Sequence, residues 1–236
     1  MHNTTGYIIK FTVALTVLAG LALSGMFYAT EPAAKRNEEV FNKRAILSSI
    51  ASHLDKPLAQ MSDEEVLQIF KDKMEQKVVN TKGDIIEGAI AEKISMKAES
   101  KKNEADMELP IFTYKGKDGN INIISIYGNG LWDKIWGYIA LKDDNKTIVG
   151  AAFDHAGETP GLGAEIKDNP TFPASFIGKT IFDGDTYTSV KVVKKVTDPK
   201  HQVDGIGGAT LTSDGVSEMM VRGIKYYLPY FQKHKK

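Results

Sequence analysis

The chain has 236 residues, of which 42% are hydrophobic, a length and composition that suit one membrane segment and one folded domain. Lysine plus arginine and aspartate plus glutamate number 30 each, so the basic excess typical of nucleic-acid-binding proteins is missing and no nucleic-acid partner is expected. The chain has no cysteine, which excludes disulfides, iron–sulfur clusters and thiolate nucleophiles.

An apolar segment near the N-terminus is long enough to cross a membrane. Residues 11–29 contain no charged side chain and only three serine or threonine side chains. About 20 helical residues span a hydrocarbon core about 30 Å thick. A cleaved signal peptide is the alternative, but its apolar region is only about 7–15 residues long, and residues 28–32 make a poor cleavage site. We therefore expect residues 1–32 to form an N-terminal segment with one retained transmembrane anchor.

The charges beside the anchor leave its orientation open. Lys10 precedes the span, whereas Lys35, Arg36, Lys43 and Arg44 follow it. Basic residues near a span favour the cytoplasmic side, so this count alone favours a cytoplasmic domain. Glutamates are interleaved with these basic residues, however, and long domains translocate largely regardless of charge.

Residues 33–108 are interpreted as a helical and mixed connecting region. Apolar residues at helical spacing predict a helix over 33–54, which Pro57 ends. The sequence Ser62-Asp63-Glu64-Glu65 is a capping box and predicts the start of a second helix. Residues 97–108 are strongly charged and predict an exposed loop.

From residue 109 onward the pattern changes to strands. Turn residues between apolar runs predict two hairpins and one further strand. The predicted strands cover residues 111–115, 120–127, 135–141, 147–153 and 186–196. A last helix is expected from about Ser213 to Leu228, with Pro229 ending or kinking it. The predicted fold class is α+β, with a mainly antiparallel sheet and flanking helices in a domain over residues 109–236.

The first of two glycine-rich loops runs from His155 to Ile166 and contains three glycines and two glutamates. Glycines let a backbone approach a ligand closely or adopt positive φ angles. A binding loop and a tight surface turn both fit this pattern. His155 has no second histidine at metal-ligand spacing, so no metal site is expected.

The second loop runs from Asp204 to Ser213 and precedes the last predicted helix. Free N–H groups at the start of a helix attract phosphate, which makes this a candidate phosphate loop. It is neither a Walker motif nor a Rossmann turn, because the spacing of both is missing. The alternative is that Thr212 or Ser213 acts as an ordinary helix N-cap.

Together, the two loops behind one membrane span resemble the FMN-binding domain family. Its flavinylation motif reads Asp, two variable residues, Ser or Thr, Gly, Ala, Thr, and residues 204–210 match it except at Gly207, where the hydroxyl is missing. The E-T-P-G-L-G loop is complete over residues 158–163. The segments 130–132 and 137–141 are most similar to the branch formed by the C subunits of Na⁺-translocating NADH:quinone reductases, with the G subunits of Rnf electron-transport complexes next.

This resemblance implies a flavoprotein subunit with FMN joined by a phosphoester to Thr210. A flavin transferase would install the FMN. The subunit would relay electrons beside other integral membrane subunits, in a complex that couples NADH oxidation and quinone reduction to Na⁺ export, and it would not be active alone. The resemblance places the domain on the periplasmic side of the inner membrane, against the charge count. An Rnf-type subunit and a non-redox membrane-anchored binding protein remain alternatives.

The resemblance also implies the residues of a flavin site, none of them catalytic. Thr210 would be the acceptor, in the motif that Asp204 opens, and Gly207, Gly208 and Ala209 would let the backbone approach the phosphate. Contacts to the isoalloxazine or ribityl group would come from Glu158, Thr159, Leu162 and Gly163. Trp132 would shield the flavin, and Lys194 would stabilise its reduced anion, with Lys191 and Lys195 as competitors. Trp132, Trp136 and Tyr138 form either an aromatic wall or part of the core.

Overall fold

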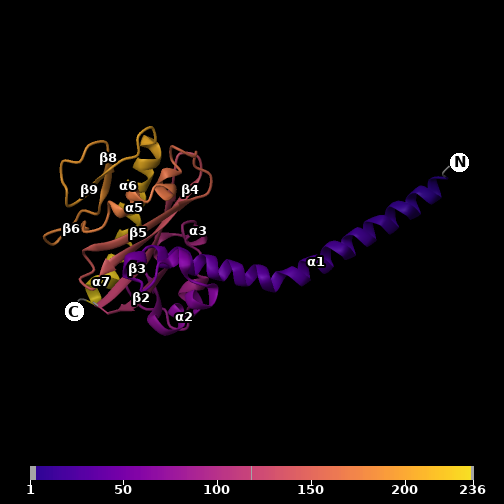
Figure 1. Cartoon of the computed structure of the whole chain (residues 1–236), viewed down its shortest axis with the longest axis horizontal. Coiled ribbons are helices and arrows are strands. Elements are labelled where there is room, and N and C mark those ends of the chain that lie inside the picture. Colours follow the sequence, from indigo (N-terminus) through magenta and orange to yellow (C-terminus); the bar gives the residue numbers. More distant parts are fainter. Residues whose placement is uncertain (1–3, 118, 235–236) are drawn as a thin grey trace. The chain divides into compact units, whose positions relative to one another are not determined.

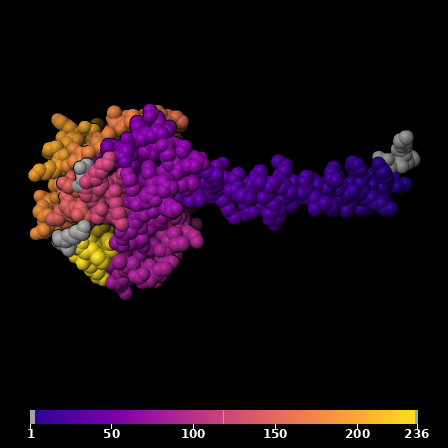
Figure 2. Space-filling model, turned by 60° about the horizontal axis from the view of Figure 1, so that its bottom comes forward, coloured from indigo at the N-terminus to yellow at the C-terminus, as the bar shows by residue number. Residues whose placement is uncertain are grey.

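The computed structural model describes residues 4–117 and 119–234. It divides into two compact units, Met1–Asn42 and Lys43–Lys236, and helix α1 (Thr5–Ser48) begins in the first and ends in the second. From Tyr7 to Tyr28 the large apolar side chains are exposed along the helix (Figure 2), and the length and composition of α1 suit a membrane span. The anchor and the helix predicted from residue 33 onward form one continuous helix through Pro32, which ends at Ser48 rather than at residue 54.

The last turns of α1 belong to the folded domain. Ile46 and Leu47 are buried there, and each such side chain contributes about 1.5–3 kcal/mol. The Arg44 guanidinium donates to the carbonyl oxygens of Leu58 at 3.1 Å and Met61 at 2.7 Å. Lys43 pairs with Glu92 in the same unit. Two of the basic residues that follow the span thus have structural roles inside the domain.

Five antiparallel strands form the main sheet in chain order (Figure 1). They are β1 (Met74–Asn80), β2 (Glu108–Gly116), β3 (Gly119–Asn129), β4 (Lys134–Lys142) and β5 (Ile148–His155). Both predicted hairpins are confirmed, as β2–β3 and β4–β5. Strand β1 was not predicted, because its first half, Met-Glu-Gln-Lys, consists of good helix formers. It lies in the segment interpreted as connecting region and pairs along β2.

The region before β2 also contains short helices. The predicted capping box is confirmed at the start of α2 (Asp63–Lys73), where the Ser62 and Glu65 side chains bond each other's backbone N–H groups. The expected loop over 97–108 is only partly correct. It contains most of α3 (Met96–Glu99) and a 3₁₀ turn at Glu104–Asp106, and Glu99 is buried with its carboxylate accepting the N–H of Glu108 at 2.9 Å. Further 3₁₀ turns cover Ala51–His53, Leu58–Gln60 and Ala91–Lys93.

Helix α6 (Thr210–Lys225) packs on one face of the sheet and carries the main core with it. The approach is close, because a side chain at Gly223 would meet Ile126 at 2.7 Å and one at Gly128 would meet Met219 at 2.8 Å. The opposite face meets the residue that follows α1, because a side chain at Gly150 would overlap the carbonyl oxygen of Ser49. Helix α6 begins three residues before the predicted start, and Pro229 lies in the first turn of α7 (Leu228–Lys233).

The single strand predicted over residues 186–196 is wrong. Residues there form β7 (Thr186–Tyr187), paired with β6 (Phe182–Asp183), and β8 (Lys191–Val193), paired in parallel with β9 (Gln202–Asp204). Ser189 lies between them at a φ of 61°, a left-handed conformation that an extended strand cannot contain. The short helices α4 (Glu165–Asp168) and α5 (Thr171–Ala174) follow the first glycine-rich loop.

Candidate functional site

The fold brings the two glycine-rich loops together at one end of the sheet. The first follows β5, and the second joins β9 to α6. A Cβ atom at Gly208 in the second loop would lie 2.8 Å from Cδ2 of Leu162 in the first. The loop of residues 130–133, between β3 and β4, joins them, because Trp132 bonds Glu158. Three segments far apart in sequence thus form one corner.

Glu158 lies at the centre of this corner and is 5% exposed. Its Oε1 accepts the backbone N–H of Trp132 at 2.9 Å, and its Oε2 accepts the Thr212 hydroxyl at 2.6 Å. Its own N–H donates to Nδ1 of His155 at 3.1 Å. In the structure the Glu158 carboxylate connects the loops. These hydrogen bonds do not test the predicted contact of Glu158 with the flavin. His155 and Thr212 support Glu158, a role that their residue types alone did not indicate.

Helix α6 begins without a side-chain cap. Its first residue is Thr210, and the preceding residue, Ala209, has no side chain that can accept a hydrogen bond. The alternative in which Thr212 or Ser213 is an ordinary N-cap is wrong, because Thr212 bonds Glu158 and Ser213 Oγ accepts the N–H of Ile206 at 3.2 Å. Without a cap, the N–H groups of the first turn are left for an anion.

The backbone before Thr210 leaves room for a phosphate. Gly207 has no heavy atom within 4 Å of the position a Cβ would take, so the loss of the family's hydroxyl there leaves open space. Gly208 has a φ of 78°, which favours glycine. Thr210 itself is exposed, with its hydroxyl on the first residue of the helix. The residues present therefore fit a phosphate group held at the start of α6.

Exposed apolar side chains surround this corner. Trp132 is 70% exposed although its backbone is bonded to Glu158, and three leucines are exposed on the same three segments. We call the set the apolar rim; it consists of Leu131, Trp132, Leu162 and Leu211. Leu211 was not predicted, although its position opposite the buried stripe of α6 is a sequence signal.

The interpretation of Trp132, Trp136 and Tyr138 as one aromatic wall is wrong. In β4, side chains alternate between the two faces, and Ile135 and Ile139 lie in the core beneath α6. Trp136 and Tyr138 therefore lie on the opposite face, away from the helix that carries Thr210. Of the three aromatic residues, Trp132 alone belongs to the corner.

The remaining predicted residues lie at the edges of the corner. Thr159 uses its carbonyl oxygen to accept the N–H groups of Leu162 and Ala164, both at 3.1 Å, which shapes the first loop. A side chain at Gly163 would overlap the Glu158 carboxylate. Asp204 ends β9 and its carboxylate accepts the N–H of Val196 at 3.3 Å.

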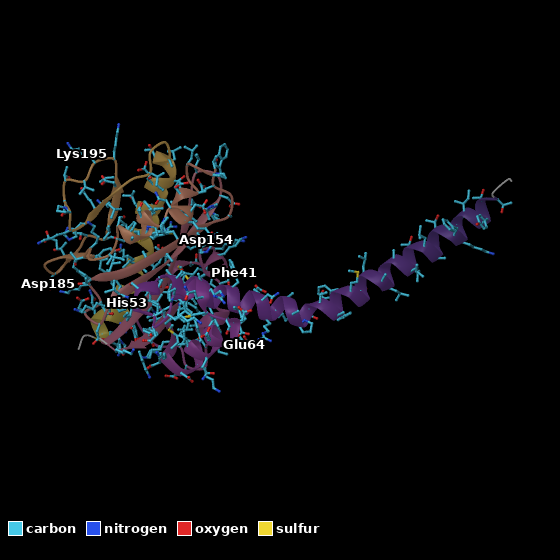
Figure 3. All side chains as sticks on the ribbon, viewed as in Figure 1. Phe41, His53, Glu64, Asp154, Asp185 and Lys195 are labelled. Atoms are coloured by element: carbon cyan, nitrogen blue, oxygen red, sulfur yellow. The ribbon has the colours of Figure 1, made fainter. Side chains whose placement is uncertain are left out.

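Lys194 follows β8 directly and is exposed. Its neighbour Lys195 projects from the same loop in Figure 3. Val193, before them, accepts the N–H of Gly205 at 2.8 Å, so these lysines begin beside the flavinylation motif. Among the described residues, neither lysine forms an ion pair with the two glycine-rich loops.

His201 holds the segment that leads into the motif. Its Nδ1 lies 2.7 Å from Oδ2 of Asp198, and its Nε2 lies 3.1 Å from the carbonyl oxygen of Phe182. Both partners are acceptors, and only the imidazolium can donate from both nitrogens. The Phe182 carbonyl and then Asp198 raise the pKa of His201, and the hydrogen bond from His201 lowers the pKa of Asp198.

Comparison with known proteins agrees with this geometry. The family described as "FMN-binding domain" matches residues 130–225, which include the three segments of the corner. The fold and the site thus define an FMN-binding domain.

Relatives and solved structures narrow the class. The C subunit of the Na(+)-translocating NADH-quinone reductase is 31% identical in Neisseria meningitidis, over 94% of this chain and 92% of that protein. The Pseudomonas aeruginosa C subunit is 32% identical over 88% of this chain and 87% of that protein. The crystal structure of the C subunit from Parabacteroides distasonis is 36% identical, with a TM-score of 0.73 over 84% of this chain and 94% of that one. The crystal structure of Shewanella oneidensis NqrC is 26% identical in sequence, with a TM-score of 0.68 over 85% of this chain and 98% of that one.

The chain belongs to the family of the C subunits of the Na⁺-translocating NADH-quinone reductases. The resemblance drawn from the two loops, and the predicted α+β fold with one N-terminal apolar helix, are confirmed.

The two adjacent glycines of the second loop should respond differently to alanine. Gly208→Ala should lower the free energy of unfolding by about 1–2 kcal/mol, because a side chain at a left-handed residue costs that much and Leu162 would be displaced. Gly207→Ala should change it by less than about 0.5 kcal/mol or raise it slightly, since the space is open. Urea denaturation of both variants measures the difference, and equal losses would contradict the geometry.

The His201 contacts predict a specific pH dependence. Because the folded-state pKa of His201 is raised above 6.5, its contribution to stability is complete below pH 6.5 and is lost as the pH rises through the folded value. The Asp198 pKa is lowered, so its contribution is present above pH 3.8 and is lost as the pH falls through its folded value. The His201–Asp198 pair therefore contributes most to the free energy of unfolding between about pH 4 and 6.5.

Unfolding midpoints of wild type and His201→Gln, measured from pH 5 to 9, test this dependence. The destabilisation caused by the variant should be largest at pH 5–6 and should shrink above pH 7. A destabilisation that does not change with pH would show that His201 is not held as the imidazolium.

Proposed function

We propose that this chain carries FMN covalently on Thr210 and relays electrons within a Na⁺-translocating NADH:quinone reductase. The observation that supports it most is the exposed Thr210 hydroxyl on the first residue of an uncapped helix, inside a loop that matches the flavinylation motif. The family named by the relatives supports the complex, and the match to the FMN-binding domain supports the cofactor.

The attachment is a phosphoryl transfer to a hydroxyl. The Thr210 oxygen forms a bond to the FMN phosphorus of FAD, the anhydride bond to the AMP half breaks, AMP leaves and the hydroxyl proton passes to solvent. A flavin transferase would catalyse the step. The accessible hydroxyl of Thr210 suits it, whereas that of Thr212 is buried against Glu158.

The chain's own residues hold the cofactor in place. The positive end of α6 stabilises the phosphodiester charge, by about 0.3–1 kcal/mol at an exposed helix terminus. Gly207 and Gly208 keep side chains out of the space beside the phosphate. The apolar rim provides the surface against which an aromatic ring system packs. When bound, FMN supplies the capacity to accept and donate electrons.

The proposal includes the side of the membrane and the partners. We place the soluble domain on the periplasmic side of the inner membrane, with α1 beside other integral subunits. The structure weakens the contrary charge count, because Lys43 and Arg44 have partners within the domain that explain them without a topological role. Oxidation of NADH and reduction of quinone would then belong to the other subunits, and this chain would carry electrons between them.

Attachment at Thr210 can be read from a denaturing gel. The chain co-expressed with a flavin transferase should give a fluorescent band, because a covalent flavin survives denaturation. Thr210→Ala should abolish the fluorescence, since no other exposed hydroxyl starts α6. Thr212→Ala serves as the control and should keep it. A fluorescent Thr210→Ala band would assign the flavin elsewhere, and a dark wild-type band in the presence of the transferase would refute covalent attachment.

The absence of native cysteine allows a clean test of orientation. Lys195→Cys places one thiol on an exposed loop of the domain, and Lys10→Cys places one before the span. A membrane-impermeant maleimide, added to cells with a permeabilised outer membrane, should label Lys195→Cys directly and Lys10→Cys only after lysis. The reverse pattern would place the domain in the cytoplasm.

A further inference from the structure

We infer that Glu158 is a positioning residue that fixes the apolar rim around Thr210, rather than a residue that touches the flavin. The assignment of a flavin to this corner rests on the proposed function. The part of the inference that concerns how Glu158 holds the apolar rim does not depend on the flavin, because all the contacts that support it lie within the chain.

The Glu158 carboxylate is buried without a cation. Among the described residues, no lysine, arginine or histidine nitrogen lies within 4.0 Å of its oxygens. A buried charge is costly unless hydrogen bonds satisfy it, and here each oxygen has a donor from a different segment. Thr212 is the third residue of α6, so the carboxylate also lies at the positive end of that helix. The favourable contacts of Glu158 thus exist only while three segments stay together.

The backbone around Glu158 is shaped to admit its carboxylate. A Cβ at Gly130 would overlap Oε1, and a Cβ at Gly163 would overlap Oε2. Neither glycine has a positive φ, so backbone conformation does not explain them. The space that their missing side chains leave is the space that the carboxyl group fills. Gly130 and Gly163 are therefore needed for the Glu158 carboxyl group to occupy its position.

The consequence concerns the rim. Trp132 is 70% exposed. A hydrogen bond from the Gly130 N–H to the Asp133 carbonyl oxygen at 2.7 Å closes its turn, and the bond from the Trp132 N–H to Glu158 ties that turn to the first glycine-rich loop. On the other side, the turn closed by Thr159 joins Glu158 to Leu162, which lies against Gly208. The Glu158 carboxyl group thus fixes the Trp132 side of the rim and the start of α6, and the Glu158 backbone leads into the turn that carries Leu162. Among the described residues, no hydrogen bond joins Glu158 to the exposed Thr210 hydroxyl.

The part that concerns how Glu158 holds the apolar rim is tested without flavin. The chain has two tryptophans, so Trp136→Phe leaves Trp132 as the sole reporter. In that background, the residual anisotropy of Trp132 fluorescence should fall in Glu158→Ala, because the loop loses its bond. Glu158→Gln should retain most of it, since its amide oxygen still accepts from Trp132 and its NH₂ can donate to Thr212 Oγ. Glu218→Ala, an exposed site on α6, is the matched control and should leave it unchanged.

Substitution of Gly163 gives an independent test of the same inference. Gly163→Ala alone should displace the carboxyl group and lower the Trp132 anisotropy, whereas in Glu158→Ala the added methyl group should have little further effect. Thr212→Val, which keeps the side-chain shape and removes the hydroxyl, should lower the anisotropy if Glu158→Ala does not fold. Folded variants whose Trp132 anisotropy equals wild type, or additive effects of Glu158→Ala and Gly163→Ala, would overturn the inference.

A last measurement concerns the flavin-loaded chain. Glu158→Ala should still give a fluorescent band on a denaturing gel, but its bound flavin should show lower anisotropy than wild type in the native state. Loss of the band in Glu158→Ala alone would make Glu158 part of attachment and contradict a positioning role. If wild type also lacks the band, the proposed function fails, and the Trp132 result still decides the role of Glu158.

Discussion

The close approach of α6 to strand β3 determines where the first turn of the helix lies. Gly128 on the strand and Gly215 and Gly223 on the helix leave no room for side chains, so the two backbones meet directly. A side chain at Gly215 would overlap the carbonyl oxygen of Asn129, which places the N-terminal half of the helix beside the end of β3. Thr210 is therefore held next to the loop that carries Trp132, and the rest of the corner is built around this contact.

Glu158, in the first glycine-rich loop, then connects that helix end to the loop that carries Trp132. Its hydrogen bonds also distinguish the hydroxyl groups that are used inside the protein from the one that is exposed. The hydroxyls of Thr212 and Ser213 are used inside the protein, to bond Glu158 and the Ile206 N–H, and neither caps α6. The Thr210 side chain is exposed, and no side chain caps the N–H groups of the first turn. Of the three hydroxyl residues at the start of this helix, Thr210 is exposed and Thr212 and Ser213 are buried.

Local signals made much of the fold predictable. The capping box at Ser62 and the turn residues between apolar runs depend on neighbours in sequence, and both predictions are confirmed. Strand β1 begins with helix-forming residues and exists only through pairing with β2, and the three-residue strands β8 and β9 are too short to show a pattern. The two loops were recognisable as a site, but the burial of Glu158 depends on Trp132 and Thr212, which are distant in sequence.

Peptide mass spectrometry of the chain co-expressed with a flavin transferase tests most directly the proposal that Thr210 is the single covalent position. Trypsin cleavage after Lys200 and Arg222 releases one peptide that contains Thr210, Thr212, Ser213 and Ser217. This peptide should carry the added mass of one FMN less one water, and fragmentation should assign that mass to Thr210. An adduct on another residue, or an unmodified peptide from protein that binds flavin, would contradict it.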